Sequence, residues 1–439
     1  MKYDIAIIGA GPAGLMAAKT AAENGLKVVL VDRKKNITEI NRACLQVFYI
    51  KWISPDAYIE PVSVENTLTG TKFHFHGPGF TIDYNGPLKP YCNAVWISPS
   101  GINVYAFKND LFGFYYDKEH FLAGLLEEVQ KRGVEVKAAT SALGAENTPE
   151  GVKVFLRDSG GDKILEARTG IAADGINSRI VETLGMNKAR KFFGPMSFVA
   201  AYMEGIEPDV LGHETGWLSV NVPSVPEARL GVGLYTGDLK WVMGDVETQK
   251  KFPTRAHWFK RARVVKTTAT VYNRRTSIRE PVNGNFMIIG DAATPQEAWI
   301  QGAVACGYQA VKAIIKERNG QNGYQEYVHW WQKAFYHNDP GYFKAKICHY
   351  ALNSCCNDEE VDYIYDVLKE QRVVPTLAFA RKPEIIKKDR PELYKKVTQS
   401  IEHAMKEYES FFASFPADSS IFPDDPVAYL GKWRTYVRK

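Results

Sequence analysis

The sequence predicts an α/β fold: a Rossmann-like domain interleaved with an antiparallel sheet and followed by a helical C-terminal region. Three observations predict it. A glycine-rich strand–helix–strand unit occupies residues 2–33. Short apolar strands that lead through an Asp into a helix recur near residues 170 and 286, and helical periodicity dominates beyond residue 318. With 439 residues, the chain is long enough for two or three structural units.

The first unit reads YDIAIIGAGPAGLMAAKTAAENGLKVVLVD. A β-branched strand leads into Gly9, Gly11 and Gly14, which have the G-x-G-x-x-G spacing and open an alanine-rich helix. The first glycine permits a tight turn, the second lets a pyrophosphate approach the backbone, and the third lets the helix pack on the strand. The helix N-terminus offers free N–H groups to the phosphates. Asp32 ends the second strand, where an acidic residue binds a ribose hydroxyl, so the unit predicts a dinucleotide site.

Two later segments have a related strand-to-helix form. GIAADGINSR places Asp174 and Gly175 after a strand of small residues. FMIIGDAATPQEAWIQGAVACG places Gly290 and Asp291 after an apolar strand and before a helix. We expect the Asp291 carboxylate to face the cofactor cleft and to accept a ribityl hydroxyl. The dipole of the helix that begins at Gly302 would stabilise negative charge on a reduced flavin ring.

These three segments, in this order and spacing, resemble the p-hydroxybenzoate-hydroxylase-type FAD-dependent oxidoreductases. This superfamily includes aromatic monooxygenases, flavin halogenases, geranylgeranyl reductases and quinone-linked dehydrogenases. The resemblance covers roughly residues 1–318 and implies FAD as the cofactor, with Gly302 and Ala303 under the pyrimidine end of the flavin. The cofactor-binding residues that we predict are Gly9, Gly11, Pro12, Ala13, Gly14, Asp32, Arg33, Arg42, Asp174, Gly175, Gly290, Asp291, Gly302 and Ala303.

Within the superfamily, the pattern is most similar to the geranylgeranyl reductase family. VVLVDRKKNITEINRACLQ resembles a segment of that family in which a Cys near the isoalloxazine follows an acidic residue, which makes Cys44 the candidate catalytic residue. ETGWLSVNVPSVPEARLGVGLYTGD resembles its stretch of aromatic residues before a Pro, although Val220 and Val222 stand where aromatics are expected. Lys118 stands at or near the place of an Arg that reaches the FAD in the superfamily.

The resemblance predicts an FAD-dependent oxidoreductase that reduces, or forms, a carbon–carbon double bond by hydride transfer at flavin N5. A flavin-dependent monooxygenase or halogenase-like enzyme stays an alternative, as does a flavin-binding electron-transfer protein. Two interpretations of Cys44 also stay open: a thiol that gives a proton to the carbon opposite the one that receives hydride, or a small apolar residue that fills space.

Composition and cysteine spacing argue against a nucleic acid partner and against a metal site. The net charge of +5 comes without a Lys/Arg tract, so we expect no nucleic acid partner. The six cysteines lack zinc or iron–sulfur spacing, and His74 and His76 share a strand face with no third ligand, so no metal site is predicted. Neither a signal peptide nor an apolar run of about 20 residues is found, which favours a cytoplasmic protein.

The predicted partners are a small-molecule or isoprenoid-like substrate and an external electron donor or acceptor. We expect no built-in NAD(P)H domain, because no second G-x-G-x-x-G unit appears. Electrons would then come from a transiently bound nicotinamide, a ferredoxin or another carrier. A monomer, a homodimer and a peripheral membrane contact all stay open. The expected division is an FAD-binding domain (1–45, 115–190 and 281–318), a substrate domain (46–114 and 191–280) and a helical C-terminal region (319–439).

Overall fold

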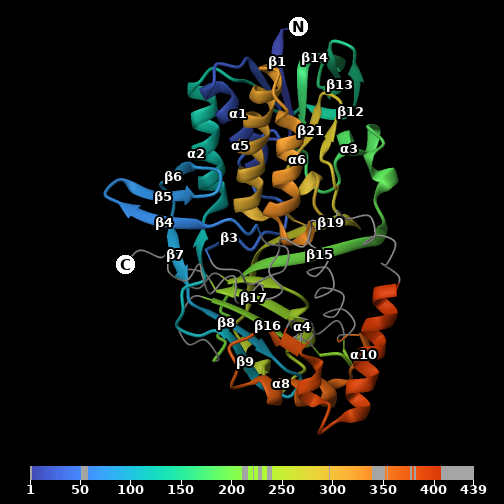
Figure 1. Ribbon diagram of the computed structural model, residues 1–439. Helices are drawn as coiled ribbons and strands as arrows, with labels where there is room; N and C mark the ends of the chain where they lie inside the picture. The colour runs from blue at the N-terminus through green and yellow to red at the C-terminus, as the bar shows by residue number, and fades with distance from the viewer. Residues whose placement is uncertain are drawn as a thin grey trace.

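A computed structural model describes the protein at residues 2–50, 58–209, 216–220, 222–225, 230–234, 240–295, 297–338, 352, 354–375, 378–379 and 382–406. The predicted fold class is confirmed: a mixed, largely parallel sheet with helices lies above an antiparallel sheet (Figure 1). The predicted helical C-terminal region contributes α8 (Asp358–Leu368) and α10 (Pro391–Lys406), and its residues 407–439 lie outside the described part of the chain.

The first sheet contains the predicted glycine-rich unit. Its strands in order are β11 (Glu135–Lys137), β2 (Val28–Val31), β1 (Tyr3–Ile8), β14 (Gly161–Ala172), β13 (Gly151–Asp158) and β12 (Ser141–Thr148), with β21 (Phe286–Ile288) also on β14 and β20 (Val282–Asn283) on β21. The long strand β14 forms an antiparallel hairpin with β13 through its first half, and its second half lies parallel to β1 and β21. The carboxyl ends of β1, β2, β14 and β21 therefore meet at one edge, where ligands bind in open α/β sheets.

Four helices pack side by side against this sheet (Figure 1). They are α1 (Pro12–Glu23), α2 (Lys118–Lys131), α5 (Trp299–Arg318) and α6 (Gly323–Ala334). Helix α1 is almost entirely buried, because its alanines allow close approach to the sheet and to α5. Helices α2 and α6 carry polar faces to solvent, as expected for outer helices.

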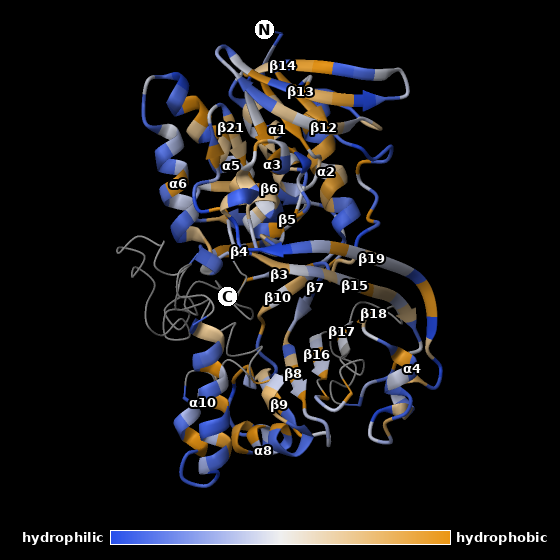
Figure 2. Ribbon diagram, turned by 90° about the vertical axis from the view of Figure 1, so that its right-hand side faces the viewer, coloured by the Kyte–Doolittle hydropathy of each residue, from blue (hydrophilic) through white to orange (hydrophobic). Residues whose placement is uncertain are grey.

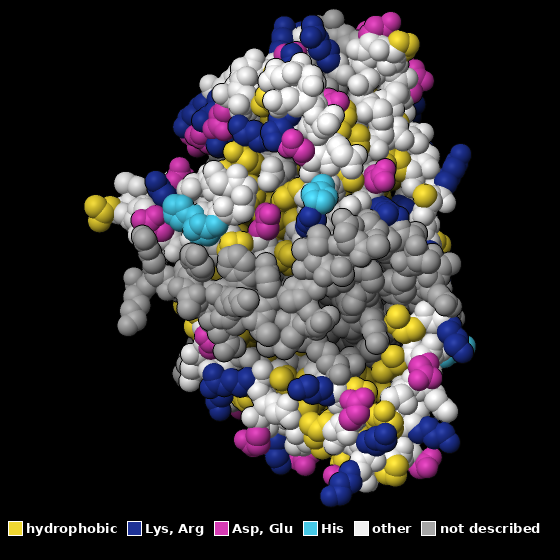
Figure 3. Space-filling view, viewed as in Figure 1, with side chains coloured by type: hydrophobic (Ala, Val, Ile, Leu, Met, Phe, Trp, Pro, Cys, Tyr) yellow, Lys and Arg dark blue, Asp and Glu magenta, His cyan; other side chains and the backbone are white. Residues whose placement is uncertain are grey.

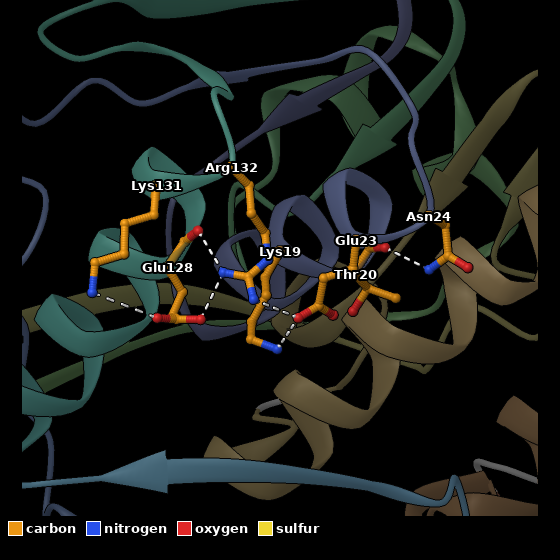
Figure 4. Close-up of polar contacts among 7 residues, drawn as sticks. All are labelled: Lys19, Thr20, Glu23, Asn24, Glu128, Lys131 and Arg132. Carbon is orange, nitrogen blue, oxygen red and sulfur yellow. Dashed lines mark hydrogen bonds and ion pairs between the residues drawn. The ribbon is translucent and has the colours of Figure 1, made fainter.

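An ionic network joins the last turns of α1 and α2 at the surface (Figure 4). Arg132 lies between the two helices, with one guanidinium nitrogen 3.0 Å from a Glu23 oxygen and another 2.6 Å from a Glu128 oxygen. Lys19 also pairs with Glu23, one helical turn away on α1, at 2.6 Å. Each such partly exposed pair stabilises the fold by only about 0.2–1 kcal/mol, so the network contributes little to stability.

The second large sheet is mostly antiparallel. Its strands in order are β19 (Arg263–Arg275), β15 (Phe192–Glu204), β18 (Lys240–Met243), β17 (Leu230–Leu234), β16 (Gly216–Val220), β8 (Asn93–Ile97) and β9 (Asn103–Phe107). The pair formed by β8 and β16 is the parallel one. Strands β15 and β19 cross the molecule between the first sheet and the rest of the second sheet (Figure 1). This long pair thus adjoins the carboxyl edge of the first sheet.

Two three-stranded sheets accompany the two large sheets. One contains β3 (Val47–Tyr49), β10 (Gly113–Tyr116) and β7 (Leu88–Tyr91), and the other contains β4 (Val62–Thr67), β5 (Gly70–Phe75) and β6 (Phe80–Tyr84). Phe73 and Phe75 of β5 belong to the same buried core as β1 and α1, so residues 62–84 pack with the first sheet. The expected domain boundaries stay a prediction, and residues 46–114 contribute buried side chains to four separate hydrophobic clusters.

The remaining short elements connect these layers. They are α3 (Arg179–Thr183), α4 (Val246–Gln249) and the 3-10 helices Met186–Ala189, Ala256–Phe259, Gly290–Ala292, Tyr336–Asn338 and Pro383–Ile386. Helices α8 and α10 form a separate core with Val104 of β9. Figure 3, drawn from the same side as Figure 1, shows Lys/Arg and Asp/Glu side chains interspersed over the described parts of the visible surface. No helix within the described ranges combines the length and apolar character needed to cross a membrane.

Candidate functional site

A cavity of about 560 Å³ lies at the carboxyl edge of the first sheet. Its size is in the range of cofactor and ligand sites in proteins. The wall is built by the start of α1, the ends of β2 and β14, the segment 39–49, the start of α2 and the start of α5. The predicted residues that line it are Gly9, Gly11, Pro12, Ala13, Asp32, Arg33, Arg42, Cys44, Asp174, Gly175, Asp291 and Ala303.

The glycine-rich turn shows three different uses of glycine. Gly9 has φ +103°, and a Cβ there would lie 2.2 Å from the carbonyl oxygen of Ala173. A Cβ on Gly14 would lie 1.8 Å from the carbonyl oxygen of Gly9, so Gly14 serves the packing of α1 and does not line the cavity. Around Gly11, no described protein atom lies within 4 Å of the Cβ position, which leaves open space on the cavity side. A pyrophosphate can therefore approach the backbone at Gly11.

The start of α1 and Asp32 complete this end of the cavity. No described side chain caps the N-terminus of α1, so its first N–H groups are open to a phosphate. The Asp32 carboxylate accepts hydrogen bonds from the backbone N–H groups of Ala10 and Lys34, both at 2.7 Å. These bonds fix the carboxylate at the cavity wall, and each oxygen keeps a lone pair for a hydroxyl. The residues present fit the adenosine diphosphate part of FAD.

Asp174 and Gly175 also line this end of the cavity, but the Asp174 side chain is hydrogen-bonded to protein whereas Gly175 lies beside a cation. The Asp174 carboxylate accepts from the Ser178 hydroxyl at 2.6 Å and from the backbone N–H of Arg179 at 2.8 Å. It thereby holds the start of α3, and burial raises the pKa of this carboxyl. Gly175 has φ +87°, and Arg42 Nη1 lies 3.4 Å from its Cβ position. The Asp174 side chain is thus engaged by protein, and Arg42 is the cation beside this turn.

The start of α5 forms the opposite end. Asp291 Oδ1 accepts a hydrogen bond from the Ala298 backbone N–H at 2.8 Å, which holds the turn that precedes the helix. Two of the predicted glycines at this end, like Gly14 at the other, do not line the cavity. Gly290, with φ +60°, faces Ala13, and a Cβ on Gly302 would lie 2.5 Å from the Phe335 ring, so both serve packing. The helix N-terminus itself still points into the cavity through Trp299, Ile300 and Ala303.

Trp299 was not singled out from the sequence. It has φ +58°, which is an unusual backbone conformation for a bulky residue and marks local strain. Its ring centroid lies 4.3 Å from that of Tyr49, and both side chains line the cavity. Phe112 also stacks with Tyr49, at 6.1 Å between centroids, and the buried Tyr91 ring lies 5.7 Å from that of Phe112. An aromatic wall therefore runs from the cavity toward the second sheet.

Cys44 lines the cavity and has a charged neighbour. Lys118, the first residue of α2, places its Nζ 3.6 Å from the Cys44 sulfur. The half-buried Cys44 thus lies at a wall that also contains the start of α5. Sequence reasoning noted Lys118 as a departure from the superfamily but did not predict this contact, because residues 74 positions apart meet only in the fold.

Gln46 explains how this pair is held. It has φ +58° and is buried, and its side-chain oxygen accepts from the Lys118 backbone N–H at 2.8 Å. Its amide nitrogen donates to the Tyr202 hydroxyl at 2.9 Å, and that hydroxyl donates to the Cys44 carbonyl at 3.3 Å. Burial raises the pKa of the Tyr202 hydroxyl above its ordinary value, so it remains a donor at neutral pH. Gln46 therefore ties the cysteine segment to both α2 and β15.

His74 of β5 and His76, which directly follows the strand, lie on the same side as predicted, with their ring centroids 6.4 Å apart. His74 contacts Glu65 at 2.8 Å and Thr81 at 3.0 Å, and His76 contacts Ser63 at 2.8 Å. Within the described part of the chain, no group of three or more His, Cys, Asp and Glu side chains is arranged to hold a metal ion. The histidine contacts are those of a polar hairpin surface.

Comparisons with known proteins also indicate a flavin-binding oxidoreductase. Residues 3–84 match a family described as pyridine nucleotide-disulphide oxidoreductase, and residues 115–224 match the FAD binding domain family. A digeranylgeranylglycerophospholipid reductase of Methanosarcina acetivorans is 25% identical, over 84% of this chain and 89% of the relative. A protein of the same name from Methanococcus vannielii is 22% identical, over 84% of this chain and 91% of the relative.

Solved structures share the fold. A geranylgeranyl bacteriochlorophyll reductase-like protein from Thermoplasma acidophilum has a TM-score of 0.62 at 17% identity, over 89% of this chain and 99% of that one. A p-nitrophenol 4-monooxygenase from Pseudomonas putida has a TM-score of 0.56 at 14% identity, over 90% and 98%. The chain is therefore an FAD-dependent oxidoreductase related to the geranylgeranyl reductases, which confirms the prediction of its class and cofactor.

Proposed function

We propose that this protein reduces, or forms, a carbon–carbon double bond in an isoprenoid-like lipid. The observation that carries the proposal is the place of Cys44: its sulfur lines the cavity that also contains the glycine-rich turn and Asp291, with the Lys118 ammonium 3.6 Å away. The names of the curated relatives, digeranylgeranylglycerophospholipid reductases that align over most of both chains, support this substrate class.

The adenosine end of the cavity would hold FAD mainly through backbone. The pyrophosphate would lie against Gly11 and the free N–H groups of α1, and Asp32 would accept a ribose hydroxyl. Asp291 would accept a ribityl hydroxyl, while Arg42 would offer positive charge beside Gly175. In this proposal the first sheet carries the cofactor, and the second sheet with the aromatic wall carries the substrate.

FAD, when bound, supplies a hydride at N5 and takes it back in the reverse direction. Cys44 would hold the proton that completes the reduction: its S–H bond breaks as a C–H bond forms on the carbon opposite the one that receives hydride. The Lys118 ammonium would stabilise the thiolate that remains and return a proton to it. Hydride and proton together add two hydrogens to the double bond, and an external donor restores the two electrons.

The aromatic wall suits such a substrate. Tyr49, Trp299 and Phe112 present flat apolar surface next to the cavity, which excludes water and accommodates an isoprenoid chain. Burial raises the pKa of the Tyr49 hydroxyl well above its ordinary value, so the wall stays uncharged at neutral pH. We also propose a cytoplasmic location: the cysteines of the described chain are free thiols, as expected in a reducing compartment.

The test is anaerobic turnover. Protein reduced with dithionite is mixed with a detergent-dispersed isoprenoid glycerolipid, and the product is read by mass spectrometry. We expect a gain of about 2 mass units per reduced double bond, which is the two hydrogens of the mechanism. When the reduced protein, freed of excess dithionite, is mixed with the lipid in air-saturated buffer, a product that gains one oxygen atom would assign the protein to the monooxygenase alternative. Flavin reoxidation without any lipid product would favour electron transfer.

Cys44→Ser tests the role of the thiol. We expect turnover to fall about 100-fold or more, the usual contribution of a positioned acid, with FAD affinity within about twofold of the wild type. Cys92→Ser is the matched control, because Cys92 is also half-buried but does not line the cavity. Equal activity of Cys44→Ser and the wild type would assign Cys44 to packing.

A further inference from the structure

Two neighbouring cysteines, Cys355 and Cys356, lie just before α8, in the core that α8 and α10 form with β9. Figure 2 shows α8 and α10 side by side at the end of the molecule opposite the first sheet, as Figure 1 does from its own side. Cys355 is the last residue of a helical turn, and Cys356 precedes Asn357, the N-cap of α8. The pair therefore lies at a junction between helical segments, and the lining of the cofactor cavity contains neither cysteine.

The junction brings the two sulfur atoms together. Successive side chains of an α-helix point in different directions, so two neighbouring cysteines within one helix would not face each other. Here only Cys355 belongs to a helical turn, and the two sulfurs lie 3.9 Å apart. Cys355 is half-buried and Cys356 is buried. A reagent from solvent can therefore reach Cys355, and the Cys356 sulfur is then close enough to react with it.

The two thiols differ in how easily they ionise. The Cys356 thiol and the Ser400 hydroxyl donate hydrogen bonds to the Cys355 sulfur, and with the Lys396 ammonium they lower the pKa of Cys355 below its ordinary value. The hydrogen bond to Cys355, together with burial, raises the pKa of Cys356. Glu360 of α8 holds the Lys396 ammonium at 2.7 Å. Because the thiolate is the reactive form, Cys355 is the nucleophile of the pair.

Packing alone does not account for the pair. A free cysteine is often a small apolar residue of a core, which would describe the buried Cys356. Cys355 differs, because it is half-buried and lies beside the Lys396 ammonium and the Ser400 hydroxyl. Across the described residues, no three or more His, Cys, Asp and Glu side chains gather around a metal position, so the chemistry available here is that of two thiols. An accessible thiolate next to a second, resolving cysteine is the arrangement of redox-sensing sites.

We propose that Cys355 and Cys356 are a modification site at which a peroxide forms a reversible disulfide between the two neighbours. The Cys355 thiolate attacks one oxygen of hydrogen peroxide, the O–O bond breaks, and a sulfenic acid forms as hydroxide leaves. The Cys356 sulfur then attacks the Cys355 sulfur, an S–S bond forms, and the S–OH bond breaks. The proton of Cys356 leaves with that hydroxyl as water. The two sulfurs together lose two electrons, which reduce the peroxide to water and hydroxide.

The backbone makes this disulfide a reversible one. The Cα atoms of neighbouring residues lie about 3.8 Å apart, whereas those of ordinary disulfides lie about 4.4–6.8 Å apart. A bond between Cys355 and Cys356 is therefore strained, and strained disulfides are the ones that thiols reduce easily. An external thiol would thus restore the pair, which distinguishes this site from a structural disulfide.

The test is peptide mass spectrometry of the FAD-loaded full chain. Reduced protein is treated with about one equivalent of hydrogen peroxide near neutral pH, and the remaining thiols are blocked with N-ethylmaleimide in denaturant before trypsin cleavage. Both cysteines then lie on the peptide 347–369 together with Cys348, so Cys348→Ser is the background, and fragmentation of the wild-type peptide locates the bond independently. We expect this peptide to lose about 2 mass units and to bind no N-ethylmaleimide at either cysteine, and dithiothreitol to restore both thiols.

Single variants separate the two roles. Cys356→Ser should stop at the sulfenic acid of Cys355, which dimedone traps, whereas Cys355→Ser should leave Cys356 as a thiol that N-ethylmaleimide blocks. Lys396→Met should slow disulfide formation roughly twofold to fivefold near neutral pH and have little effect at about pH 9, where the thiol ionises without help. Lys395→Met is the matched control, because Lys395 is an exposed lysine at the next position of α10, and it should react like the wild type.

A peptide that keeps both thiols after peroxide overturns the proposal, and so does a disulfide that joins either cysteine to a different one. Cys92 is the internal control, since it is also half-buried, and it should stay a thiol at the same dose. Equal oxidation of Cys92 would show general reactivity and would also overturn the proposal. The readout is a peptide mass and needs no lipid substrate, so its outcome is independent of the proposed function.

Discussion

The two ends of the cavity are built in different ways. At the adenosine end, Gly9, Gly11 and Asp32 lie within one strand–helix–strand unit, and the site is mostly backbone: a positive φ, open N–H groups and a close approach. At the other end, Cys44 meets Lys118, and Tyr49 meets Trp299, across 74 and 250 positions of sequence. A site that local backbone builds is visible as a motif, whereas a site that distant side chains build becomes visible only in the fold.

The strongest test of this difference compares two glycines of one motif. Gly14→Ala should prevent stable folding or cost several kcal/mol, because its Cβ would lie 1.8 Å from the Gly9 carbonyl oxygen, which cannot move freely. Gly11→Ala should leave the thermal midpoint of the FAD-free protein unchanged and weaken FAD binding about 100-fold, because its Cβ enters only ligand space. Thermal unfolding and flavin fluorescence titration measure the two effects. Equal behaviour of both variants would contradict the assignment of Gly11 to the ligand and Gly14 to packing.

Asp32 tests whether the adenosine end depends on this one side chain. Asp32→Ala leaves the N–H groups of Ala10 and Lys34 without their acceptor and removes the proposed ribose contact. We expect FAD affinity to fall about tenfold to 100-fold, in line with about 1–3 kcal/mol for lost charged hydrogen bonds. Asp4→Ala is the control, since Asp4 also accepts a backbone N–H, from Lys27, at 2.8 Å but does not line the cavity. An equal loss in both variants would indicate a general effect on stability.

The same contrast explains which features of the fold and the site could be predicted from the sequence. The fold class and the glycine-rich unit were predictable, because strand and helix periodicity and the spacing of Gly9, Gly11 and Gly14 are local properties. Trp299 and Gln46 were not, since both have φ +58°, which only tertiary contacts stabilise in residues of their type. Gly302 had the spacing of a cofactor residue, yet its missing side chain makes room for Phe335. Motif spacing does not distinguish such packing from ligand contact.

Gln46 offers a test of the side-chain end. Gln46→Ala removes the acceptor of the Lys118 backbone N–H and a donor to the Tyr202 hydroxyl, and it should lower the free energy of unfolding by about 1–2 kcal/mol. We also expect lower turnover, because the Cys44 segment loses its ties to α2 and β15. Tyr202→Phe removes the contacts of its hydroxyl with the Gln46 amide and the Cys44 carbonyl but keeps the acceptor of the Lys118 N–H, so it should have the smaller effect on unfolding by urea. A turnover unchanged in Gln46→Ala would show that the cysteine segment holds its position without Gln46.

The smallest expected effect concerns two cysteines, Cys44 at the cavity wall and Cys306 in the buried core of α5. Burial raises the pKa of the Cys306 thiol to about 12, so at pH 8 only about one molecule in ten thousand carries the reactive thiolate there. Because the folded-state pKa is raised, alkylation of Cys306 should stay negligible at neutral pH and increase about tenfold per pH unit toward 12. Cys44, half-buried at the cavity wall, should be alkylated by iodoacetamide at pH 8 and be protected by bound FAD. Peptide mass spectrometry distinguishes the two sites, with Cys306→Ala as the control. Alkylation of Cys306 before Cys44 in folded protein would show that the packed core of α5 opens more readily than reagent reaches the cavity wall.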